Sequence, residues 1–77
     1  MATVVDLLKD ALSYPDYDKR INFLVAGLLS ADANDTPEKE AINKGYLKDV
    51  YEYCCHYKGE QKKYINQIKD IINNYVN

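Results

Sequence analysis

Apolar residues recur three and four residues apart along most of the chain, which is the spacing of amphipathic helices. The first such stripe predicts a helix from Val4 to about Ser13. Thr3 and Asp6 stand three residues apart at its start, as the two side chains of a capping box do. Pro15 ends this helix, because the residue before a proline avoids helical geometry.

A second stretch, from Ile21 to Ala31, is apolar almost all round. It predicts a helix that begins at Asp16 or Tyr17 and ends near Ala33. A helix that is apolar on every side is normally a buried one, so we expect it at the centre of the fold. Gly27 lies inside it, where a glycine costs about 1 kcal/mol relative to alanine. We therefore expect another helix to cross closely at Gly27.

Thr36 and Pro37 mark the start of a third helix, since threonine is a favoured N-cap and proline suits the first helical position. This helix is predicted to run from Pro37 to about Lys58 and to stop at Gly59, a residue type common just past a helix end. A fourth helix is predicted from about Glu60 to Tyr75. Its amphipathic stripe consists of Tyr64, Ile65, Ile68, Ile71, Ile72, Tyr75 and Val76.

Only one or two residues around Gly59 separate the last two predicted helices. The last helix can therefore fold back on the third, or extend as an arm that packs on a neighbouring subunit. The chain has no internal repeat and no linker longer than a turn. The pattern predicts an all-α fold, a compact bundle of three to four short helices that forms a single domain over residues 1–77.

The segment from Tyr46 to Tyr57 carries more apolar surface than one neighbouring helix can cover. One seam consists of Tyr46, Val50, Tyr53 and Tyr57, and a second seam consists of Leu47, Tyr51 and Cys54. Together they span roughly half of the helix circumference, whereas an ordinary stripe is only a little over about 100° wide. We therefore expect a second partner, and in so short a chain we expect another molecule. The candidate interface residues are Tyr46, Leu47, Val50, Tyr53, Tyr57, Tyr64, Ile68 and Ile72.

Length and charge narrow the classes of partner. The chain has 77 residues and a formal net charge of −2. A domain of this size hides only about 60% of the surface of its unfolded chain, and a partner subunit is a common way to compensate. A nucleic-acid binder needs a clustered basic face, but acidic residues run through both lysine groups here. No apolar stretch approaches the ~20 residues that span a bilayer. We therefore expect a protein partner, with no nucleic acid and no membrane.

Cys54, Cys55 and His56 are the residues that most invite a chemical role. Consecutive helical residues point about 100° apart, so these three cannot converge on one zinc ion or form a nucleophile and base pair. We expect Cys54 to pack inside, and Cys55 and His56 to lie on the rim. Adjacent cysteines offer no spaced disulfide framework, which favours a reducing compartment.

The remaining candidate chemistry is also weak. The acidic residues Asp16, Asp18, Asp32 and Asp35 lack the pattern of a calcium-binding loop. The three glycines are isolated, so no glycine-rich phosphate loop is present in the sequence. We expect no catalytic residues, no metal and no cofactor.

The sequence therefore predicts a non-enzymatic protein–protein interaction protein that is a homo-oligomer or a subunit of a larger assembly. A small inhibitor or adaptor that binds one host protein is the alternative. A helix-turn-helix-type regulator that binds nucleic acid is less favoured. The short helical chain has the general character of the structural and accessory proteins of bacteria and their phages. We expect a cytoplasmic location, or the virion if a phage encodes the chain.

Overall fold

The computed structural model describes residues 3–30 and 36–76, and these parts of the chain form four α-helices. Helix α1 spans Val4–Leu12, α2 spans Tyr17–Ser30, α3 spans Pro37–Cys55 and α4 spans Lys62–Val76. No strand occurs within the described ranges. The prediction of a small all-α bundle is confirmed. The predicted end of the second helix near Ala33 lies outside the described residues.

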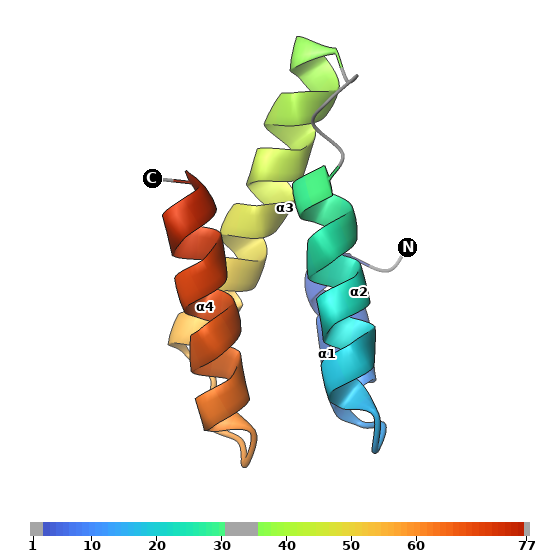
Figure 1. Cartoon of the computed structure of the whole chain (residues 1–77), viewed down its shortest axis with the longest axis vertical. Helices are drawn as coiled ribbons and strands as arrows, with labels where there is room; N and C mark the ends of the chain where they lie inside the picture. The colour runs from blue at the N-terminus through green and yellow to red at the C-terminus, as the bar shows by residue number, and fades with distance from the viewer. Residues whose placement is uncertain (1–2, 31–35, 77) are drawn as a thin grey trace.

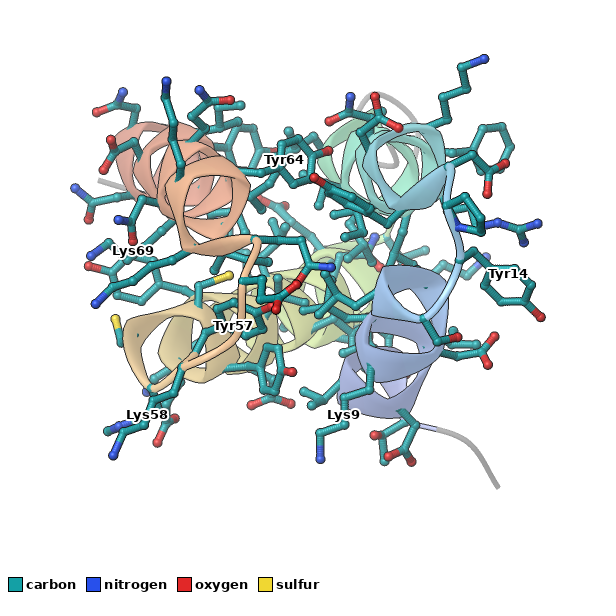
Figure 2. The ribbon with its side chains drawn as sticks, turned by 90° about the horizontal axis from the view of Figure 1, so that it is seen from below. Lys9, Tyr14, Tyr57, Lys58, Tyr64 and Lys69 are labelled. Carbon is teal, nitrogen blue, oxygen red and sulfur yellow. The ribbon has the colours of Figure 1, made fainter. Side chains whose placement is uncertain are left out.

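The four helices form two layers (Figure 1). Helices α2 and α4 lie in front, with α1 behind α2 and with α3 passing behind both, an arrangement that Figure 2 shows from below. Helix α3 is the longest, with 19 residues, and it crosses the bundle obliquely. It packs against α1, α2 and α4, whereas α1 and α4 do not pack against each other. The first part of α3 extends beyond the ends of the other helices.

Hydrogen bonds at Thr3 and Thr36 confirm two of the predicted helix starts. The Thr3 hydroxyl accepts from the Asp6 backbone N–H at 3.1 Å, and the Asp6 carboxylate accepts from the Thr3 N–H at 3.0 Å. The bond from the Thr3 N–H is the main reason that the pKa of Asp6 is lowered, because it stabilises the carboxylate. The Thr36 hydroxyl accepts from the Lys39 N–H at 3.4 Å.

The end of α3 differs from the prediction. The helix ends at Cys55 and is capped by His56, about one turn earlier than expected. Gly59 does not adopt a positive φ, so it is not a left-handed helix cap. It makes room for the Tyr57 ring, which a Cβ at this position would overlap. The Tyr57 hydroxyl donates to Gln61 Oε1 and accepts from the Gln61 N–H at 3.3 Å, so this ring fixes the turn that leads into α4.

The core draws buried side chains from every helix. Helix α3 contributes Leu47, Val50 and Cys54, and α4 contributes Ile65, Ile68 and Ile72. Helices α1 and α2 add Val4, Leu8, Ala11, Ile21 and Val25. The core therefore lies between α3 and the three helices that surround it.

The expectation that α2 is buried on every side is wrong. Ile21 and Val25 face the core, but Phe23 on the opposite side is 85% exposed. A Cβ added to Gly27 would meet no atom within 4 Å, so the predicted close crossing is wrong as well. Each of the four described helices keeps an outer face, and no further helix among the described residues covers that face of α2.

Helix α4 folds back on α3, which decides between the two directions that the sequence left open. The packing of α4 on α3 is the most extensive between any two of the described helices. Leu47, Val50, Ile68 and Ile72 are each at most 1% exposed. The expectation that these four side chains contact another molecule is therefore corrected, because helices of the same chain already cover them.

Replacing Leu47 by alanine should destabilise the protein more than replacing Leu24. Leu47 is 1% exposed, whereas Leu24 is only half-buried. A Leu→Ala change in a core costs about 2–5 kcal/mol, which is comparable with the whole free energy of unfolding of a domain this small, about 5 kcal/mol. Urea unfolding of both variants at one fixed protein concentration measures the difference. A larger loss for Leu24→Ala would contradict this description of the core.

Candidate functional site

Most of the tyrosines pack against the core rather than facing outward. The rings of Tyr17 and Tyr64 meet edge to face with their centroids 5.5 Å apart, and those of Tyr53 and Tyr57 lie 6.1 Å apart. Figure 2 shows Tyr57 and Tyr64 pointing inward between the helices. The Lys9 ammonium lies 5.8 Å from the centre of the Tyr53 ring. Three of the predicted interface residues, Tyr53, Tyr57 and Tyr64, thus make their main contacts within the chain.

The Tyr64 hydroxyl joins α4 to the first turns of α2. It lies 2.8 Å from the backbone oxygen of Asp18 and 2.7 Å from Oδ1 of Asn22, and it donates its proton to these acceptors. Burial, followed by the negative charge of Asp18, raises the pKa of Tyr64 to about 12. The hydroxyl therefore stays protonated, and keeps its donated bond, well above neutral pH.

The raised pKa of Tyr64 predicts a loss of stability in alkali. An unfolded tyrosine ionises near pH 10, whereas Tyr64 in the folded chain has a pKa of about 12. Its contribution is therefore complete below about pH 10 and disappears as the pH rises through 12. A Tyr64→Phe variant should start about 1 kcal/mol less stable at pH 7 and lose less over this alkaline range. Urea unfolding at several pH values tests this, and an equally steep loss in both proteins would contradict it.

Tyr46 is the predicted interface residue that stays most exposed, at 42%. It lines a groove of about 510 Å³ between α1, α2 and α3. The groove is lined by Thr3, Val4, Leu7, Leu24, Leu28, Tyr46 and Asp49. We call this set the apolar groove, because aliphatic side chains and one tyrosine ring form most of its wall.

Helical spacing places these side chains together. Leu24 and Leu28 lie one turn apart on α2 and therefore point to the same side of that helix. Leu7, at the outer edge of α1, is 49% exposed. Ile42 precedes Tyr46 by one turn of α3 and is 53% exposed, so the apolar surface continues along α3 beyond the groove.

The sequence analysis did not identify Leu7, Leu24 or Leu28 as functional residues. One signal for Leu7 is present in the sequence. Leu7 and Leu8 are adjacent, and successive helical residues point about 100° apart, so a single neighbouring helix cannot cover both. Leu8 is fully buried and Leu7 is not. Leu24 and Leu28 gave no such signal, because they lie within a stretch that is apolar almost all round.

A second hollow, of about 330 Å³, lies on the other side of Asp49. It is lined by Val5, Asp49, Glu52, Tyr53 and His56. Its charged and imidazole side chains are exposed, and they come from α3 and from its capping residue His56. Across residues 3–30 and 36–76, no three His, Cys, Asp or Glu side chains are grouped so that they could hold a metal ion. The apolar groove is therefore the stronger candidate for a functional site.

The two adjacent cysteines occupy different environments, as their helical spacing predicts. Cys54 is buried, whereas Cys55 and His56 are exposed. Burial raises the pKa of the Cys54 thiol to about 11. The thiolate is the reactive form of cysteine, so the Cys54 thiol is both shielded and in its unreactive form near neutral pH.

The burial of Cys54 predicts that one thiol per chain reacts quickly with a disulfide reagent. At pH 8 the exposed Cys55 should react within minutes, and Cys54 should react only as fast as the chain opens. A chromogenic thiol assay with and without urea measures both phases. The Cys55→Ser variant is the control and should lose the fast phase alone. Fast reaction of both thiols in the native wild-type protein would contradict the packing of α3.

Comparison with known proteins identified no relative, since no protein-family model, no curated protein and no solved structure matches the chain. No helix in the described part of the chain combines the length and the apolar character needed to cross a lipid bilayer. A proposal about function must therefore rest on the geometry of the chain itself.

Proposed function

We propose that the protein is a non-enzymatic subunit that assembles with further protein subunits through the apolar groove. The exposure of that groove is the observation that carries the proposal. Leu7 and Tyr46 within it are 49% and 42% exposed, and the neighbouring Ile42 is 53% exposed. An exposed apolar patch with a polar rim is typical of protein interaction sites.

The chemistry of the groove fits another protein as its ligand. Aliphatic walls accept the apolar side chains of a docked helix, and tyrosine is enriched at the energetic centres of interfaces. Thr3 and Asp49 are the polar residues that line the groove, and both are exposed, as the polar rim residues of an interface usually are. The balanced charge of the chain, with a net of −2, does not favour nucleic acid as the partner.

Self-assembly is the form of this function that the size of the chain favours. A domain of 77 residues buries only about 60% of its unfolded surface, and association with like subunits adds to a small core. The same groove would serve an inhibitor or adaptor that binds one host protein, which is the alternative. A self-assembling subunit would suit the structural proteins of bacteria and phages, in the cytoplasm or in the virion.

The proposal predicts that the mass of the protein in solution rises with concentration above that of the 8.9 kDa chain. Sedimentation equilibrium over a wide concentration range measures this. A Leu7→Glu variant places a charge in the groove, which should raise the dissociation constant at least tenfold, a change that corresponds to about 1.4 kcal/mol. Leu7 is half exposed, so the variant should keep the wild-type fold.

The matched control is Ile71→Glu. Ile71 is 48% exposed on α4, a helix that does not contribute to the groove, so this variant should assemble like the wild type. A protein that remains monomeric at every concentration would refute the proposal and favour the adaptor alternative. Equal weakening by Ile71→Glu and Leu7→Glu would show that assembly does not depend on the groove.

A further inference from the structure

Phe23 is the most exposed large apolar side chain in the described part of the chain, at 85%. It lies on α2, on the face opposite the buried residues Ile21 and Val25. Its neighbours one turn further along are Ala26 and Gly27, both exposed, and a Cβ added to Gly27 would meet no atom within 4 Å. Phe23 therefore projects from α2 with small residues one turn after it, and its ring remains largely exposed to solvent.

The projecting ring and the apolar groove lie beside each other on the same helix. Leu24, the residue after Phe23, lines the groove, and so does Leu28 one turn later. Successive helical residues point about 100° apart, so the ring and the groove occupy adjoining sides of α2. A two-fold axis beside α2 would place the Phe23 ring of each copy over the groove of the other. Contacts that are exchanged in this way are the property of an isologous dimer.

We propose that the protein forms a two-fold dimer in which the Phe23 side chain of each copy occupies the apolar groove of the other. This inference rests on the proposed function, because it names the subunit that fills the groove. Leu7, Leu28 and Tyr46 form the receiving wall. A phenylalanine exposes about 150–250 Å² that can be buried, and the two-fold axis doubles each contact.

Charge complementarity supports a second copy as the occupant. Lys19 precedes Phe23 by one turn and is exposed, and Asp49 lines the groove and is exposed. Neither side chain takes part in the ion pairs found between described residues, which are Asp16–Arg20 and Glu40–Lys44. Insertion of Phe23 into the groove brings Lys19 of one copy toward Asp49 of the other. Within the single chain the charge of Lys19 acts only at longer range on Asp16, so the exchange would give Lys19 and Asp49 a closer partner of opposite charge.

One side of the molecule is large enough to supply the contact area that a stable dimer needs. A standard interface buries about 800 Å² per partner, which is roughly a seventh of the 5499 Å² surface of the chain. Exposed apolar side chains on α1, α2 and the first part of α3 are available for such an interface, among them Leu7, Phe23 and Ile42. The dimer is therefore possible without any rearrangement of the buried core.

Substitution of Phe23 tests the inference directly. Sedimentation equilibrium of the full chain should give a dimer for the wild type and a dissociation constant at least tenfold higher for Phe23→Ala. Because Phe23 is 85% exposed, the variant should unfold at the wild-type temperature when both are diluted to monomers. Ile71→Ala, at a residue 48% exposed on α4, is the matched control and should dimerise as the wild type does.

Swapping the charges of Lys19 and Asp49 tests whether these two side chains pair between the copies. Lys19→Asp and Asp49→Lys should each weaken the dimer, and the double variant Lys19→Asp with Asp49→Lys should restore most of the wild-type affinity. A double variant no stronger than either single variant would overturn the pairing, and with it the proposed orientation of the two copies.

The outcomes separate this inference from the proposed function. A monomer at all concentrations would overturn both. A wild-type oligomer that Phe23→Ala leaves unchanged would overturn the exchange of Phe23 while keeping assembly. A mass that grows beyond two copies would overturn the closed two-fold arrangement, because a head-to-tail contact extends without limit unless it closes into a ring.

Discussion

The burial of the broad apolar surface of α3 is the constraint on which the rest of the structure depends. Its two seams span too wide an arc for one neighbouring helix. The chain meets this requirement by packing α4 along α3 and by placing α1 and α2 against its other sides. Leu47, Val50 and Cys54 are consequently all buried in the single chain. The direction of α4 and the oblique path of α3 both follow from this need.

Because α1, α2 and α4 all pack against α3, apolar surface on other faces of the helices remains uncovered. Helix α2 contributes Ile21 and Val25 to the core, and its outer face with Phe23 remains in solvent. Between the start of α1, the second half of α2 and the middle of α3, the side chains do not close completely, and the apolar groove results. The groove and the exposed ring thus have one physical origin, which is that four short helices cannot cover every apolar face.

The sequence predicts that the chain is all-α, and it predicts where the helices lie and where two of them begin. Local signals determine each of these features. Thr3 and Thr36 cap their helices by bonds to residues only three positions away. The different burial of Cys54 and Cys55 follows from the angle between successive residues of one helix. The predicted central position of α2 failed because an apolar helix surface indicates burial only if enough chain is available to cover it. Four of the predicted interface residues, Leu47, Val50, Ile68 and Ile72, are covered by helices of the same chain. Periodicity identifies a surface that needs covering, but it does not tell which helix covers it.

Phe23 adds little to the stability of the single chain, because its side chain is 85% exposed. An exposed phenylalanine has a lower helix propensity than lysine or arginine, so folding of α2 gains nothing from it. Full burial of such a side chain is worth about 1.5–3 kcal/mol, or roughly 3–6 kcal/mol for the two rings of a dimer. A micromolar dimer requires about 8 kcal/mol. Phe23 is therefore insufficient by itself, and the leucines and Tyr46 of the groove must contribute a comparable share to a stable pair.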